Sequence, residues 1–124
     1  MSAPNMINAT SVYAKTTGNT PAGISAEVLL ANSAASGKVL KINTITAANV
    51  DGTNAYAATV AYNTLANGAG TSYPVASTIS VPANATLIIL DKSNALYLEE
   101  DKSIVVTAGG ASKISFVVSY EEIS

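Results

Sequence analysis

The densest group of reactive side chains in this sequence is the run Glu99, Glu100, Asp101 and Lys102. Only 11% of the residues are charged, so three consecutive carboxylates stand out from the rest of the chain. Carboxylate oxygens are ligands for hard cations such as Ca²⁺, and paired carboxylates are used for acid and base catalysis. Each of these two uses requires a particular spacing and environment.

The spacing does not fit a calcium-binding loop. A loop of the EF-hand type that began at Asp91 would need acidic or amide oxygens at its third and fifth positions. Ser93 and Ala95 occupy those positions. We therefore expect no metal-binding residues here, and we interpret the acidic run as a solvated turn between two strands.

Catalysis by the same carboxylates is also disfavoured. A catalytic pair needs two environments that push the two pKa values apart, whereas adjacent residues in a tight connection should all meet water. Strand alternation would also place Glu100 on the side opposite to Glu99 and Asp101. We expect no catalytic residues in this run.

The remaining composition leaves few routes to catalysis. The chain has no Cys and no His, which excludes disulfides, thiolate chemistry and imidazole chemistry. A nucleophilic Ser needs a base within hydrogen-bond reach and commonly a Gly-x-Ser-x-Gly turn, and neither is recognisable. The sequence therefore predicts a protein that is not an enzyme and that holds no cofactor.

The charge distribution bears on binding partners. All six basic residues are Lys, they are scattered, and the net charge is −2. Without Arg or a basic patch, nucleic acid is an unsuitable partner. The first residues lack the basic and apolar regions of a Sec-type signal peptide, and apolar runs such as 87–90 are too short to span a bilayer. We expect no membrane partner.

The elements that would position these residues are short strands. Candidate strands occupy 11–17, 26–31, 38–50, 55–63, 76–81, 85–91, 95–98, 103–108 and 113–123. Gly, Pro, Asn and Asp separate them, and no segment is suited to a helix that would connect parallel strands. This pattern predicts an all-β fold, an antiparallel β-sandwich of jelly-roll or immunoglobulin-like type with about eight to nine strands. We expect one domain over 11–124, preceded by an N-terminal arm at 1–10.

Several local features are predicted within this sandwich. Asp51-Gly52 should form a hairpin turn between 38–50 and 55–63, and 65–74 should be a flexible hairpin loop. Alternation places Leu40, Ile42 and Thr44 on one face of their strand, and Val39, Lys41, Asn43 and Ile45 on the other. Inward-facing positions flanking the acidic run are Leu96, Leu98, Ile104 and Val106.

The tyrosines have three alternative roles. Tyr56 and Tyr62 share one strand face, and we interpret them first as core residues, second as contacts with another protein and third as a carbohydrate-binding surface. The absence of Trp removes the usual stacking platform for sugars.

The order of turns and strands carries a resemblance. "KVLKINTITAANVDGTNAYAATVAY" (38–62), "TISVPANATLIILD" (78–91) and "ALYLEEDKSIVVTAGGASKISFVVSYEEI" (95–123) resemble the pattern of small tailed-bacteriophage virion structural proteins. The resemblance covers about residues 26–123.

This resemblance implies a non-enzymatic virion protein, most simply a capsid decoration or cement subunit. Such a protein would bind the major capsid protein or other virion subunits and would associate with itself in many copies. The alternatives are a neck, tail or fibre-associated structural protein and a carbohydrate-binding module of the adsorption apparatus. Expected contact elements are the arm at 1–10, the loops at 31–37 and 65–74, and an exposed sheet edge.

Overall fold

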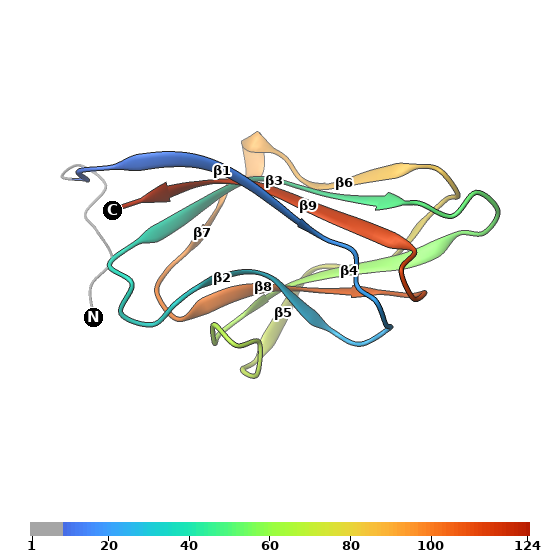
Figure 1. Ribbon diagram of the computed structural model, residues 1–124, viewed down its shortest axis with the longest axis horizontal. Coiled ribbons are helices and arrows are strands. Elements are labelled where there is room, and N and C mark those ends of the chain that lie inside the picture. The colour runs from blue at the N-terminus through green and yellow to red at the C-terminus, as the bar shows by residue number, and fades with distance from the viewer. Residues whose placement is uncertain (1–8) are drawn as a thin grey trace.

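Two antiparallel sheets packed face to face make up the computed structural model, which describes residues 9–124 (Figure 1). The strands are β1 (Val12–Asn19), β2 (Glu27–Asn32), β3 (Val39–Asn49), β4 (Tyr56–Asn63), β5 (Ser72–Val81), β6 (Thr86–Leu90), β7 (Leu96–Leu98), β8 (Lys102–Ala108) and β9 (Ile114–Ile123). One short 3₁₀ helix, η2 (Lys92–Asn94), lies between β6 and β7.

Strand order identifies the type of sandwich. Sheet A has the order β1-β9-β3-β6, with the short β7 also paired to β3, and sheet B has the order β2-β8-β4-β5. All pairs are antiparallel. Most consecutive strands alternate between the sheets, which is the connectivity of a jelly roll with β7 added at one edge. The expectation of a single-domain antiparallel β-sandwich is confirmed, and of the two predicted types this is the jelly roll.

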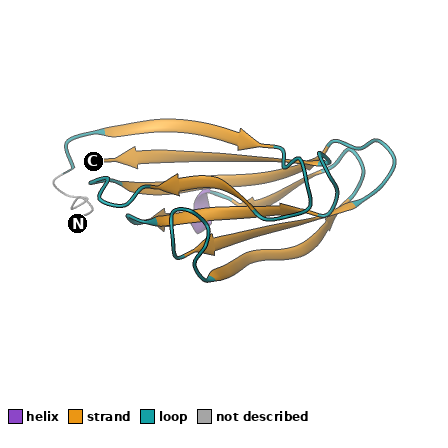
Figure 2. Ribbon diagram, turned by 60° about the horizontal axis from the view of Figure 1, so that its bottom comes forward, coloured by secondary structure: helices purple, strands orange, loops and turns teal. Residues whose placement is uncertain are grey.

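The core lies between the two sheets, whose strands run along the long axis of the molecule (Figure 2). Leu98, Ile104 and Val106 are fully buried, as their alternation predicted, and Leu96 is partly buried. Tyr56 and Tyr62 are partly buried and pack against the core. Their interpretation as core residues is therefore supported.

A β-bulge in β3 overturns the predicted alternation in that strand. The pairing of β3 with β9 shifts register between Ile42 and Thr44. The extra residue, Asn43, moves the residues after it to the other face. As a result Ile42 and Ile45 are both fully buried, although simple alternation placed them on opposite faces.

The expected hairpin at Asp51-Gly52 is wrong, because β3 belongs to sheet A and β4 to sheet B. The connection instead crosses between the sheets. Asn49 Oδ1 accepts a hydrogen bond from Asp51 N at 2.8 Å, and Asp51 Oδ2 accepts one from Asn54 N at 2.9 Å. Asp-Gly tolerates the tight backbone of either kind of connection, so it does not distinguish a hairpin from a crossover.

The hairpin predicted around 65–74 is present as the β4–β5 connection. It is shorter than expected, because β5 begins at Ser72 and includes Pro74. Proline lacks the N–H that a strand donates, but it is tolerated on edge strands, and β5 is an edge of sheet B.

Candidate functional site

The acidic run connects β7 in sheet A to β8 in sheet B, so it is a crossover between sheets. Asp101 has a φ of 61°, a left-handed conformation that Asp adopts more easily than most residues. Glu99 is exposed, but Glu100 is only 2% exposed. The expectation of a turn whose residues all meet water is therefore wrong for Glu100.

Glu100 is buried because its carboxylate holds the β2–β3 connection. Its Oε2 accepts a hydrogen bond from Gly37 N at 2.8 Å, while Oε1 has no hydrogen-bond partner among the described residues. The next residue binds the same connection through its backbone, since Asp101 N donates to Asn32 O at 2.8 Å. The acidic run thus fixes one loop through a side chain and a main-chain group.

The following residues fix a second loop, the β4–β5 connection. Asp101 Oδ1 accepts from Ala66 N at 3.2 Å, Lys102 Nζ donates to Thr64 O at 3.2 Å, and Ser103 Oγ donates to Leu65 O at 2.7 Å. The crossover therefore connects the two loops that the sequence indicated as contact elements. We call residues 99–103 the loop clamp.

Buried asparagines complete the support of these loops. Asn32, Asn49 and Asn63 are the last residues of β2, β3 and β4, and each is at most 3% exposed. Asn32 Nδ2 donates to Lys38 O at 2.9 Å and to Leu98 O at 3.0 Å. These side chains satisfy backbone groups that a strand would otherwise satisfy. Sequence reasoning missed their role, although an Asn at or near the end of three successive strand patterns was a usable signal.

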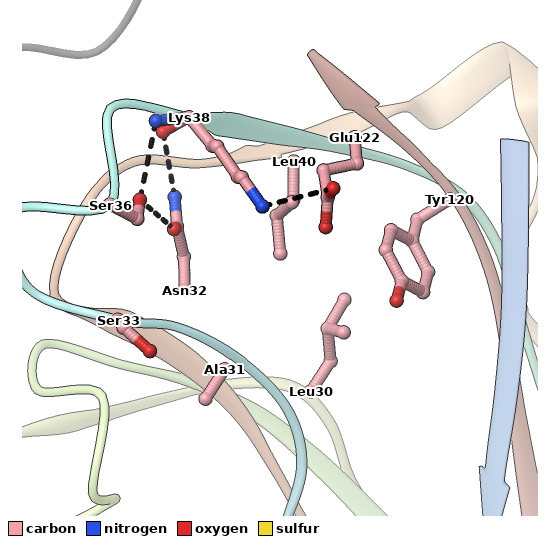
Figure 3. A pocket seen from close by; sticks show the side chains of 9 residues that line it. All are labelled: Leu30, Ala31, Asn32, Ser33, Ser36, Lys38, Leu40, Tyr120 and Glu122. Carbon is pink, nitrogen blue, oxygen red and sulfur yellow. Dashed lines mark hydrogen bonds and ion pairs between the residues drawn. The ribbon is translucent and has the colours of Figure 1, made fainter. Parts of the chain in front are cut away.

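A small cavity lies between β2 and the strands β3 and β9 (Figure 3), with a volume of about 120 Å³. Its floor includes Leu30 and Leu40, and its rim carries Lys38 and Glu122, whose Nζ and Oε1 atoms are 3.1 Å apart. This volume suits a few waters or one small side chain, whereas sites for drug-sized ligands measure roughly 300 to 1,000 Å³.

Glu122 also pairs with Lys15, at 3.3 Å between Oε2 and Nζ. The hydrogen bond from Lys38 is the main cause that lowers the pKa of Glu122 below its ordinary value. The hydrogen bond from Lys15 adds to this effect, and burial opposes it. Glu122 is thus a charged partner for Lys15 on β1 and for Lys38, which directly precedes β3.

The other two carboxyl groups whose pKa is shifted, those of Asp51 and Asp91, lie in turns. The backbone hydrogen bond from Asn54 lowers the pKa of Asp51, and the hydroxyl and N–H of Ser93 lower the pKa of Asp91. Burial raises the pKa of the Tyr62 hydroxyl. Within residues 9–124, no three acidic side chains converge where they could hold a metal ion. These acids support turns and ion pairs, and their arrangement does not provide a proton donor and acceptor facing a common cleft.

The expected contact elements are distributed as follows. Residues 1–8 of the arm lie outside the described residues, and Thr10 N and Ser11 N donate to Ser124 O at 2.6 and 2.9 Å. The two loops lie against the loop clamp. β1 and β2 form the sheet edges on one side, and β5, with β6 and β7, forms those on the other. Helix η2, the one helix in the described part of the chain, is far too short to cross a membrane.

Comparisons with known proteins show the fold and leave the family open. No protein-family model matches the chain. No curated protein matches it either. A solved structure described as "Bacillus endospore appendages form a novel family of disulfide-linked pili" is similar, with a TM-score of 0.51 and 12% identity. The match covers 98% of this chain and 95% of that one. At this identity the similarity establishes a shared fold.

Proposed function

We propose that this chain is a non-enzymatic structural subunit that occurs in many copies within a larger assembly. The observation that carries the proposal is the use made of the acidic run. Glu100 and Asp101, the most plausible reactive groups in the sequence, each accept a hydrogen bond from the backbone of a loop. These carboxylates hold two loops in a fixed shape. Loops of fixed shape are suited to recognition by surface complementarity.

The fold similarity supports the same class of function. The similar solved structure is described as belonging to a family of disulfide-linked pili. That description also specifies disulfide linkage, whereas the present chain contains no Cys. Contacts made by residues 1–124 in an assembly would therefore form without disulfides, and we expect them to depend on the fit of surfaces.

The finer proposal is a capsid decoration or cement protein of a bacteriophage virion, which the resemblance of the turn and strand pattern favours. By binding across neighbouring coat subunits, such a protein stabilises the assembled shell through mass action, without any chemical step. The fixed β2–β3 and β4–β5 loops and the arm at 1–10 would supply the contacts. A subunit of a pilus-like appendage is the second candidate, favoured by the similar solved structure.

Antibody labelling in negative-stain electron microscopy of material from the producing culture tests the proposal. Regularly spaced label on capsids supports decoration, and label along filaments supports an appendage subunit. Recovery of the protein solely as a free species, without label on any particle or filament, contradicts the structural role. Deleting residues 1–10 should lower occupancy on the particle, and unchanged occupancy and particle melting temperature would refute the contact assigned to the arm.

A further inference from the structure

The β4–β5 loop contains an asparagine that is followed by a glycine, Asn67-Gly68. Asn67 is exposed, and Asn54, Asn84 and Asn94 are exposed as well. Each of those three precedes an alanine, whereas Asn67 is the one asparagine in the sequence that precedes a glycine. The residue after it therefore distinguishes Asn67 from the other exposed asparagines.

An asparagine side chain can react with the backbone nitrogen of the next residue. That nitrogen attacks Cγ of the side-chain amide and closes a succinimide ring. A Cβ on the next residue crowds this approach, and glycine has no Cβ. Asn67 and Gly68 thus form a reactive pair in a loop that meets water.

The side chain of Asn67 is folded back over the peptide bond with which it would react. Its Oδ1 accepts a hydrogen bond from Ala69 N at 2.9 Å, which makes an Asx turn. Attack at Cγ moves negative charge onto Oδ1, and the N–H of Ala69 already points at that oxygen. Backbone donors that are in place where an oxyanion develops stabilise it. The loop therefore favours the modification of its own asparagine.

Gly68 supplies the attacking nitrogen. Its φ is 79°, a left-handed conformation, and its N–H donates to Leu65 O at 3.0 Å. That hydrogen bond has to open before the nitrogen can attack. It lies within the loop, and opening it costs less free energy than opening the pairing of two strands.

A second residue of similar chemistry, Asp51, precedes Gly52. An ionised carboxylate resists the same attack, because its charge makes the carbon a poorer electrophile. The backbone hydrogen bond from Asn54 is the main cause that lowers the pKa of Asp51, so this carboxyl is ionised at neutral and alkaline pH. The reaction is therefore expected at Asn67 and not at Asp51.

We propose that Asn67 is a site of spontaneous deamidation. A bond forms between Gly68 N and Asn67 Cγ, the bond from Cγ to Nδ2 breaks, and Nδ2 leaves as ammonia with the hydrogen of Gly68 N. Water then opens the succinimide on either side of its nitrogen. Opening at Cγ gives an aspartate, and opening at the main-chain carbonyl gives an isoaspartate, whose backbone runs through Cγ. No oxidant, reductant or cofactor takes part.

Either product would alter a loop to which we assign a contact. The aspartate adds a negative charge, and the isoaspartate adds a methylene to the backbone. Gly68 packs closely on sheet B, since a Cβ added there would lie 3.0 Å from Val28 Cγ2 and 3.6 Å from Val105 Cγ2. A longer backbone has little room there, so the loop should move away from the sheet. This inference does not depend on the proposed function, because the reaction needs no partner.

Peptide mapping by mass spectrometry of the full chain, incubated in alkaline buffer, tests the proposal. Alkaline buffer should speed the reaction, because the attacking nitrogen has to lose its proton. The peptide with Asn67 should convert to two products of equal mass, and one ammonia should be released for each chain modified. Peptides with Asn54, Asn84 and Asn94 should stay intact. Asn67→Gln should abolish the release of ammonia, and Asn94→Gln, at another exposed position, should retain it.

A synthetic peptide of residues 64–71 sets the timescale for the same sequence outside the fold. If Asn67 in the full chain is unmodified when that peptide has fully converted, the folded loop protects it and the inference is wrong. Equal conversion at Asn67 and at the asparagines that precede alanine would also overturn the inference, because neither the glycine nor the Asx turn would then matter.

Discussion

Replacement of Asn63 by Ala should destabilise the protein more than any other single change in its loops. Asn63 is fully buried at the end of β4. Its Nδ2 donates to Gly68 O, Gly70 O and Ser72 Oγ at 3.1, 3.2 and 2.8 Å, and its Oδ1 accepts from Leu65 N and Gly70 N at 3.0 Å. These five hydrogen bonds close the β4–β5 loop, so Asn63→Ala leaves several backbone groups without partners.

The magnitude follows from these bonds. Each hydrogen bond contributes about 0.5 to 1.5 kcal/mol, and water entering the opened loop would recover part of the loss. The expected cost is about 3 kcal/mol, which lowers the melting temperature by about 10 to 18 °C in a chain of this length. Asn63→Asp should be at least as harmful, because a carboxylate oxygen would then face the carbonyl oxygens of Gly68 and Gly70.

Denaturant titrations followed by circular dichroism would measure the loss of free energy. Hydrogen exchange should show that protection is lost first at residues 64–71. Asn67→Ala is the matched control in the same loop, because Asn67 is exposed and its Oδ1 accepts one local bond, from Ala69 N at 2.9 Å. The free energy of unfolding of that variant should fall by less than about 1 kcal/mol. A loss at Asn63 as small as that at Asn67 would refute the account of buried asparagines as loop supports.

Three further outcomes are expected. Glu100→Gln should have a free energy of unfolding within about 1 kcal/mol of the wild type, or higher, because it keeps an acceptor for Gly37 N and removes a buried charge. Glu100→Ala should lower the free energy of unfolding by about 1 to 3 kcal/mol in denaturant titrations. Equal losses of stability in the two variants would show that the fold needs the charge of Glu100. Because Glu122 has a lowered pKa in the folded state, its contribution to stability is present above the ordinary pKa of a glutamate and is lost as the pH falls through the lowered value. Glu122→Gln should flatten the acid limb of a plot of melting temperature against pH, and an unchanged limb would contradict the role of the lysine pairs. Millimolar calcium should leave the melting temperature unchanged, because the carboxylates of Glu100 and Asp101 bind different loops, and a rise abolished by Asp101→Asn would contradict this.

Strand positions were predictable because they depend on local chemistry. Alternating apolar residues and turn formers located every strand of the structure, with differences of a few residues at most ends. Assignment of strands to sheets was not predictable in this way. The Asp51-Gly52 connection has the residues of a tight hairpin, but the strands it joins pair with different partners far away in the sequence.

The bulge in β3 and the contacts of the loop clamp also depend on pairing between segments that are far apart in the sequence. A bulge at Asn43 arises from pairing with β9, so alternation within β3 alone could not reveal it. The burial of Glu100 depends on Gly37, which is distant in the sequence and approaches because β2 ends and β3 begins beside the crossover. The sequence pattern identified the acidic run as the feature to explain, and the fold explains it as a support for two loops.

A cryo-electron microscopy reconstruction of the assembly that carries the protein tests the central claim most directly. The account predicts many symmetry-related copies of the jelly roll, held together without disulfides. A reconstruction with a single copy facing a bound small molecule would contradict it.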